Sequence, residues 1–207
     1  MGVRSRIFAA TYDRFSAGSE KAGLSDMRRR VVGGATGRVL EVGGGTGANL
    51  PHYGSGVESL TITEPEPPML TRLRRRLTEE GTRAEVVQAS AEHLPFEDGS
   101  FDAVVSTLVL CGVDDQGQAL REARRVLRPG GTLVFIEHVR SEEPGVARWQ
   151  DRLNPINRFV SCCDCNRDTL AAIESEGFEV AELERTELPK APPFVRPLIV
   201  GTAHVRG

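Results

Sequence analysis

Residues 38–49 read Arg-Val-Leu-Glu-Val-Gly-Gly-Gly-Thr-Gly-Ala-Asn, and this stretch decides the fold. The apolar residues Val39, Leu40 and Val42 suit a short strand that is buried on both faces, as in a parallel sheet. Four glycines within five positions follow at once, which is more than an ordinary turn from strand to helix requires. A strand that breaks into glycines and then enters a helix points backbone N–H groups into a crevice. The stretch therefore predicts a nucleotide or nucleoside site, with a helix that begins near Thr46.

The composition is that of an ordinary globular protein. The 207 residues suffice for one domain with at most a terminal extension, and 39% of them are hydrophobic. The net charge of −3 and the lack of a basic stripe with interleaved aromatic residues argue against a nucleic-acid partner. No apolar run approaches the ~20 residues of a membrane span, and no secretory signal is visible. We therefore expect a cytoplasmic protein without a membrane span, and a homodimer is left open.

Four cysteines occur, and three of them crowd together as Cys162, Cys163 and Cys165, with Cys111 well before them. A disulfide framework needs spaced partners, and a structural zinc site usually needs two separated pairs. We therefore expect reduced thiols and no metal site. For the three crowded cysteines, a place in the lining of a binding site or a metal-binding role is the alternative.

Apolar strands alternate with helices along most of the chain. Helices are expected over 4–32 (two helices), from 46, over 67–80, from 114 or 115 to 127 and over 168–176, and strands over 38–42, 60–63, 83–88, 101–108, 132–136, 178–184 and 198–205. This order indicates a Rossmann-like, doubly wound α/β sheet of seven strands that is mostly parallel. A link too short for a crossover helix joins the last two strands, so they should pair as an antiparallel hairpin at the sheet edge.

Two segments flank this sheet within the single domain expected over residues 1–207. Residues 1–32 should form an N-terminal helical cap, with the basic run Arg28-Arg29-Arg30 on a solvated helix face. Residues 139–165 contain prolines and a glycine that interrupt the pattern, so we expect an irregular cover over the ligand site, with short helices as the alternative.

Glu64 is the second informative residue of the ligand site. It follows the glycines at about the interval at which an acid meets ribose hydroxyls in dinucleotide-binding folds, and a carboxylate can accept hydrogen bonds from both hydroxyls of a diol. Gly43, Gly45 and Ala48 also fit the dinucleotide fingerprint formally, so an NAD(P)-dependent oxidoreductase is one interpretation. A dinucleotide, however, needs a second nucleotide-binding half, which the pattern beyond residue 108 does not repeat.

The chain resembles the class I methyltransferases that use S-adenosylmethionine, from about Tyr12 to its C-terminus. Four segments carry the resemblance in the family's order: residues 41–47 (Glu-Val-Gly-Gly-Gly-Thr-Gly), 63–70 (Thr-Glu-Pro-Glu-Pro-Pro-Met-Leu), 90–102 (Ser-Ala-Glu-His-Leu-Pro-Phe-Glu-Asp-Gly-Ser-Phe-Asp) and 127–133 (Leu-Arg-Pro-Gly-Gly-Thr-Leu). The resemblance implies one class I methyltransferase domain, with S-adenosyl-L-methionine as cofactor, S-adenosyl-L-homocysteine as product and a small molecule as methyl acceptor. The methyl group would move by in-line displacement to sulfur, oxygen or nitrogen, which requires positioning and the exclusion of water.

By this resemblance, the methionine and ribose parts of the cofactor lie against the first two strands. The backbone at Gly43 and Gly45 comes close to the methionine part, and Glu41 helps to order the turn. Glu64 binds the ribose hydroxyls. Tyr12 closes over the cofactor, or else packs in the core as an ordinary aromatic residue.

The adenine ring would lie against the second and third of the four segments. Pro65 and Met69 border the ring, while the Ala91 backbone N–H and the Glu92 side chain address its edge. Ser90 stands where many relatives place Asp, so this contact to the adenine amine would lack the usual charge.

The acceptor would meet the methyl group at the ends of the fourth and fifth strands. Thr107 and Leu108 are expected beside the sulfonium. If the acceptor is a thiol, a base would help to form a thiolate near neutral pH. His138 follows the fifth strand and is the candidate for this catalytic role, with a purely structural histidine as the alternative.

A narrower resemblance concerns the acceptor. Residues 107–111, 137–139, 165–166 and 195–197 resemble the methyltransferase-like group that includes membrane-associated thiol methyltransferases of animals. Members of that group carry a hydrophobic N-terminal anchor, and the sequence shows no such segment, so we do not expect membrane association. A thiol acceptor is the suggestion that remains.

Two other functions compete with methyl transfer. An NAD(P)-dependent oxidoreductase would often use a Tyr-x-x-x-Lys pair, but the only lysines are Lys21 and Lys190, and neither lies four residues after a tyrosine. A non-catalytic protein that binds the cofactor and acts through a partner is the second, and an exposed apolar face on residues 139–165 would favour it.

Overall fold

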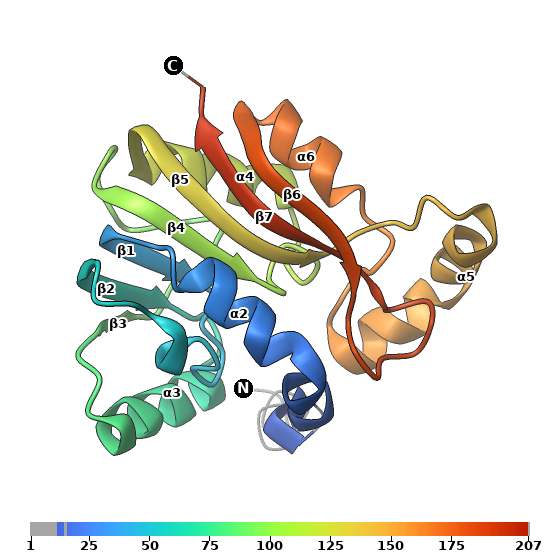
Figure 1. Cartoon of the computed structure of the whole chain (residues 1–207), viewed down its shortest axis with the longest axis horizontal. Coiled ribbons are helices and arrows are strands. Elements are labelled where there is room, and N and C mark those ends of the chain that lie inside the picture. Colours follow the sequence, from blue (N-terminus) through green and yellow to red (C-terminus); the bar gives the residue numbers. More distant parts are fainter. Residues whose placement is uncertain (1–11, 15, 207) are drawn as a thin grey trace.

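A seven-stranded sheet forms the centre of the molecule in the computed structural model, which describes residues 12–14 and 16–206 (Figure 1). The strand order is β3-β2-β1-β4-β5-β7-β6. The strands are β1 (Gly37–Val42), β2 (Val57–Thr63), β3 (Glu85–Val87), β4 (Phe101–Thr107), β5 (Leu127–His138), β6 (Phe178–Glu187) and β7 (Pro197–Val205). The first five strands run parallel, and β7 pairs antiparallel with both β5 and β6. The predicted fold class, with its antiparallel pair at the edge, is confirmed.

Helices cover both faces of the sheet. They are the π-helical turn η1 (Glu20–Leu24), α2 (Ser25–Val32), the 3₁₀ turn η2 (Leu50–His52), α3 (Pro67–Glu80), α4 (Gln116–Val126), α5 (Pro144–Ser161) and α6 (Thr169–Ser175). In Figure 1, α2 crosses in front of the sheet and α4 lies behind it. Because side chains alternate along a strand, Leu40 and Val104 pack into the core under α4 and α6, whereas Val39 and Val105 pack under α2 and α3. These two cores make the sheet doubly wound.

The helix expected from Thr46 is wrong. Gly43, Gly45 and Gly47 all have positive φ, at 59°, 56° and 87°, and such values cannot belong to a right-handed helix. The chain instead passes through turns and forms only the short η2 before β2. The glycines that marked the ligand site thus also remove the helix that was expected to follow them.

The irregular cover expected over residues 139–165 is also wrong, because most of it is the 18-residue helix α5. Pro144 occupies the first turn, where its missing N–H costs nothing, and Pro155 is tolerated within the helix. Figure 1 shows that α5 extends away from the sheet. Among the described helices, none has the length and the apolar composition needed to cross a bilayer.

The N-terminal helical cap is described only in part, because residues 4–11 of the predicted helices lie outside the described residues. Within the described part, Gly23 adopts a φ of 138° and places a kink between η1 and α2.

Gly201 is a position where the sheet tolerates no side chain, and Gly201→Ala should destabilise the fold. A Cβ atom there would lie 2.0 Å from the carbonyl oxygen of Glu182 in β6 and 3.0 Å from the ring of Phe135 in β5. We expect the free energy of unfolding to fall by about 3 kcal/mol, because the main chain of β6 must move. Urea unfolding followed by circular dichroism measures the change. Gly18→Ala is the control, since nothing lies within 4 Å of its Cβ position; an equal loss in both variants would contradict the argument.

Candidate active site

The glycine turn after β1 combines close packing with one open position. A Cβ atom on Gly43 would lie 2.7 Å from the Val109 side chain, and one on Gly44 would lie 2.3 Å from Ile62. At Gly45 the nearest atom to a Cβ would be the carbonyl oxygen of Gly43, at 4.0 Å. Gly45 therefore presents its backbone to open space, and another molecule can approach it there.

Glu64 lies directly beside this open position, at the carboxyl end of β2. Its Oε2 accepts a hydrogen bond from the Gly45 N–H at 2.9 Å, and its Oε1 accepts one from the Glu66 N–H at 2.9 Å. Burial raises the pKa of the Glu64 carboxyl, and the two backbone hydrogen bonds oppose this rise. Each carboxylate oxygen can accept a further bond, so the geometry is compatible with a bound diol.

A buried guanidinium lies beneath the turn, and the sequence analysis missed it. Arg28 is 2% exposed; its Nη1 donates to Asn49 Oδ1 at 2.7 Å and to Thr107 Oγ1 at 2.9 Å. The expectation of a solvated Arg28 is therefore wrong. Arg28 stands one helical turn after Leu24 and one before Val32, both of which are buried, and this spacing could have revealed its inward direction.

Glu41 of β1 belongs to the same buried network. Its carboxylate accepts hydrogen bonds from Asn49 Nδ2 at 2.9 Å and from the Tyr53 hydroxyl at 2.7 Å. Burial raises the pKa of Glu41 to about 7, against the effect of these two bonds and of the charge on Arg28. Glu41 thus lies under the turn and fixes Asn49 and Tyr53, which follow it in the chain.

A second buried carboxylate, Glu137, organises the segment that follows β4. It is fully buried and accepts hydrogen bonds from Ser106 Oγ at 2.7 Å, the Val109 N–H at 3.0 Å and the Leu110 N–H at 3.1 Å. Leu108 has a φ of 60°, a conformation that costs roughly 1–2 kcal/mol in a non-glycine residue. Such strain is typical of functional sites and persists only where the surroundings impose it. Here Glu137 supplies part of that constraint.

The residues predicted around the adenine ring lie at the carboxyl ends of β2 and β3 and just beyond. Met69 and Ala91 are buried, Ser90 is partly buried, and Pro65 is exposed. The Oε1 atom of Glu92 accepts hydrogen bonds from the Asp114 and Asp115 N–H groups, at 2.8 and 3.0 Å. One oxygen of Glu92 therefore fixes the loop before α4, a structural role that the sequence analysis did not assign.

The start of the described chain lies over the glycine turn. The Thr46 hydroxyl donates to Asp13 Oδ1 at 2.5 Å, which joins the turn to the N-terminal segment. Burial raises the pKa of the neighbouring Tyr12 hydroxyl, and Arg28 and Cys111 are among the groups whose charges act on it. Tyr12 thus lies between the buried network and the segment that follows β4, where it can cover a molecule at the turn.

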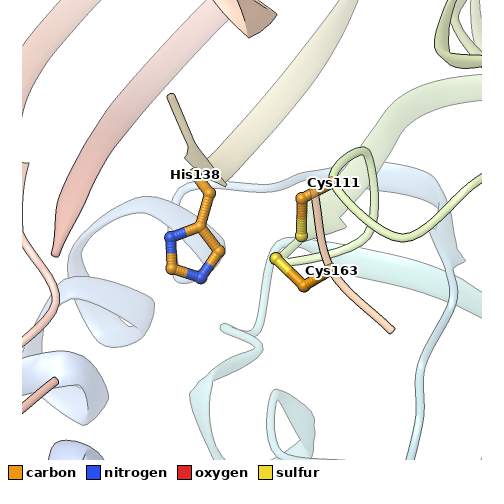
Figure 2. Close-up of side chains that lie close together, drawn as sticks. All are labelled: Cys111, His138 and Cys163. Atoms are coloured by element: carbon orange, nitrogen blue, oxygen red, sulfur yellow. The ribbon is translucent and has the colours of Figure 1, made fainter. Parts of the chain in front are cut away.

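His138 ends β5 and is 5% exposed. Burial lowers the pKa of its imidazole to about 4, despite nearby backbone groups of Pro197 and Val195. The ring is therefore neutral at physiological pH, and its Nδ1 forms no hydrogen bond of ordinary geometry with the described residues. Figure 2 shows the ring beside Cys111 and Cys163. No spacing in the sequence connects these residues, because they lie in three separate parts of the chain.

The described cavities differ in their position relative to the strand ends. One of about 520 Å³ lies at the amino ends of β4 and β5, lined by residues such as Asp102 and Thr132. Ligands of open α/β sheets bind at the opposite, carboxyl ends, so this cavity is not the expected site. A groove of about 490 Å³ lies beside the segment after β4 and the end of α5, with Gly112, Phe159 and Cys162 among its lining residues.

The raised pKa of Glu41 should make stability depend on pH. The folded-state pKa of about 7 exceeds the ordinary value of 4.5, so between these values the folded state binds more protons and stability falls as the pH rises. Glu41→Gln stays uncharged and can keep both hydrogen bonds. Relative to the wild type, the variant should therefore gain stability between pH 5 and pH 8, by at most about 3 kcal/mol. Chemical unfolding across this range measures the difference, and a constant difference would contradict the buried-charge argument.

Comparisons with known proteins agree with this geometry. Residues 40–135 match the family model described as "Methyltransferase domain". Human thiol S-methyltransferase TMT1A is 34% identical over 203 residues, which cover 95% of this chain and 82% of the relative. Human TMT1B is 37% identical over 178 residues, covering 82% and 72%. Phosphatidylethanolamine N-methyltransferase of Cereibacter sphaeroides is 36% identical over 155 residues, covering 70% and 74%.

Solved structures share the fold at lower identity. A "SAM-dependent methyltransferase, possible histamine N-methyltransferase" of Thermotoga maritima superimposes with a TM-score of 0.72 and 24% identity, over the whole of both chains. The [4+2]-cyclase SpnF superimposes with a TM-score of 0.70 and 20% identity, over 88% of this chain and 80% of the other. The fold thus also occurs in a protein named for another reaction.

The described residues suit S-adenosylmethionine. The backbone at Gly45 faces open space, and the Glu64 carboxylate lies next to it with capacity to accept from vicinal hydroxyls such as those of a ribose. The relatives decide against the NAD(P)-dependent oxidoreductase that the glycine pattern had left open. This chain belongs to the class I S-adenosylmethionine-dependent methyltransferases, and S-adenosylmethionine is its cofactor.

Proposed function

We propose that the protein transfers a methyl group to the sulfur of a small-molecule thiol. The observation that carries the proposal is the buried lining beyond the carboxyl ends of β4 and β5. There the thiol of Cys111 and the neutral imidazole of His138 lie close together, both side chains buried. The oxygens of Glu137 are turned toward backbone N–H groups of the segment after β4. The names of the relatives TMT1A and TMT1B point to the same acceptor class.

A thiol suits this lining better than an amine. An alkyl amine is protonated at pH 7, and a protonated amine needs a carboxylate to bind and deprotonate it. A thiol has a pKa of roughly 8.5, is mostly neutral at pH 7 and tolerates apolar surroundings. The engaged oxygens of Glu137 therefore favour sulfur over nitrogen as the nucleophile.

The chain's contribution to methyl transfer is mainly positioning. Bound S-adenosylmethionine supplies an electrophilic methyl carbon on its sulfonium sulfur. Glu137 holds the segment after β4, with its strained Leu108, beside the expected methyl position. His138, with a pKa of about 4, is a weak general base at neutral pH, so proton removal by this imidazole alone is inefficient.

A second candidate function follows from α5. Four large apolar side chains on this helix are more than 60% exposed: Trp149, Ile156, Phe159 and Val160. The sequence analysis named such a face as the sign of a protein that acts through a partner. A cofactor-binding protein with α5 as its docking face is therefore the competing proposal, and turnover without a partner decides between the two.

Glu64→Ala should weaken the binding of S-adenosylmethionine about 30-fold or more, because two hydrogen bonds to a charged acceptor are lost. Isothermal titration calorimetry measures the affinity. Glu66→Ala is the matched control, since its carboxyl is close in the chain, exposed and without a helix-capping bond. Equal affinities of the Glu64 variant and the wild type would remove the assigned role of this carboxylate.

The acceptor proposal is tested with three compounds that differ in one group: 2-phenylethanethiol, 2-phenylethanol and 2-phenylethylamine. We expect the thiol to give S-adenosylhomocysteine and the S-methyl product. The rate of methylation of the thiol should be at least 100-fold higher than the rates for the alcohol and the amine. Mass spectrometry identifies the products. Faster methylation of the amine would refute the thiol proposal, and binding of the cofactor without turnover of any compound would favour the partner-dependent alternative.

A further inference from the structure

Three side chains with soft or borderline donor atoms converge from separate parts of the chain. Cys111 lies in the segment after β4, His138 is the last residue of β5, and Cys163 follows α5. One ring nitrogen and the two sulfur atoms all lie within 4.8 Å of one another. Figure 2 shows the three side chains turned toward a common point, with the outer ring nitrogen, Nε2, on the side of Cys163.

We propose that Cys111, His138 and Cys163 form a zinc site with three protein ligands and one open position. Zn–S bonds of about 2.3 Å and Zn–N bonds of about 2.0 Å place tetrahedral ligand atoms roughly 3.5–3.8 Å apart. The ligand atoms all lie within 4.8 Å of one another, so ion binding requires a movement of at most about 1 Å. Rotation of half-buried Cys163, at the end of α5, can supply that movement.

The donor set itself selects the class of metal. Two thiolates and an imidazole prefer zinc over calcium or magnesium, which require oxygen ligands. Three protein ligands with a free fourth position are typical of reactive rather than structural zinc sites. The other cysteines do not complete the cluster: Cys162 is exposed, and the Sγ atom of Cys165 lies 3.9 Å from Asn154 Oδ1.

His138 distinguishes this site from a simple thiol pair. Cys111 and Cys163 are close enough for a hydrogen bond between their sulfur groups, so oxidation to a disulfide is the competing outcome. A disulfide forms between the two sulfur atoms without the imidazole, whereas a metal site would use its nitrogen as a third ligand. Histidine ligands usually donate their second ring N–H to a carbonyl or carboxylate. The Nδ1 of His138 has no hydrogen bond of ordinary geometry among the described residues, but it lies beside the backbone of Val195 and Pro197, where such an acceptor is at hand.

The site lies where an acceptor would enter. Gly112 and Cys162, which adjoin two of the ligands in the chain, line the groove of about 490 Å³ together with Pro155 and Phe159. A small molecule in this groove is therefore close to the cluster. Leu108, with its strained backbone, begins the same segment that carries Cys111.

The role of the ion rests on the proposed thiol methylation. The acceptor's sulfur would occupy the open position; its S–H bond breaks as the Zn–S bond forms, and the proton leaves to solvent. A lone pair of that sulfur then forms the new S–C bond to the methyl group, while the bond from the methyl carbon to the sulfonium sulfur breaks and its electron pair stays on that sulfur. The products are a thioether and S-adenosylhomocysteine, and no oxidant or reductant is needed.

Zinc binding is tested on the full chain without cofactor or acceptor. The protein is purified with a reductant, stripped with a chelator and titrated with zinc chloride against a chromogenic chelator. We expect one zinc per wild-type chain, and binding at least about 100-fold weaker in Cys163→Ser and His138→Gln. Cys162→Ser, which changes the exposed neighbour, should bind within threefold of the wild type. Cobalt(II) should give thiolate-to-metal charge-transfer absorption in the wild type and Cys162→Ser, but not in Cys163→Ser.

Three results would overturn the site: no saturable zinc uptake by the wild type, equal losses in Cys162→Ser and Cys163→Ser, or a Cys111–Cys163 disulfide in protein whose reduced form takes up no zinc. Circular dichroism checks that each variant is folded. The outcome is separate from that of the acceptor test, because zinc binding is measured without methyl transfer. If the protein binds zinc but methylates only the amine, the zinc site stands and the thiol acceptor is refuted. If Cys163→Ser still methylates the thiol, only the activation of the acceptor by zinc is refuted.

Discussion

The active-site end of this fold depends on the buried guanidinium of Arg28. It joins α2 to Asn49 behind the glycine turn and to Thr107 at the end of β4. A buried charge is stable only when it is paired and its donors are satisfied; the removal of one partner of a buried pair typically costs roughly 3–5 kcal/mol. Glu20 supplies the opposite charge through a direct contact of 3.1 Å, whereas Glu41, with its pKa raised to about 7, carries only part of its charge at neutral pH. The position of the turn, the helix and the strand end are therefore coupled.

Glu137 is likewise a buried ionisable group whose hydrogen-bonding capacity is satisfied, on the other side of the site. Its carboxylate is withdrawn from water and satisfied by backbone N–H groups of the segment after β4. The bonds that it accepts offset the strain at Leu108, so a local conformation that is unfavourable by itself becomes part of the stable fold. The two buried carboxylates, Glu41 and Glu137, thus support the glycine turn after β1 and the segment after β4. Neither needs to take part in the chemistry.

Methyl transfer places modest demands on a protein, because the cofactor already carries an activated carbon. What the chain supplies is a shaped and dry space in which the nucleophile meets that carbon. The thiols and the imidazole beyond β4 and β5 are suited to sulfur chemistry, whereas α5 offers an exposed apolar surface next to the same groove. Under the proposed function, specificity toward the acceptor resides in the loops and in α5, while the sheet and its glycine turn serve the cofactor.

The sequence by itself determined the fold class, the strand order along the chain and the glycine turn after the first strand, because hydrophobic period and glycine clusters are local properties. It also placed Glu64 beside the turn. Two predictions of secondary structure from the sequence were wrong. The helix expected from Thr46 is absent because Gly43, Gly45 and Gly47 have positive φ, and the expected irregular segment is a helix because α5 accommodates Pro144 and Pro155. Only the tertiary structure decided that Arg28 is buried, that Glu137 braces Leu108, and that Cys111, His138 and Cys163 meet. These relations join residues far apart in the chain, and sequence spacing carries no record of contacts that the folded sheet creates.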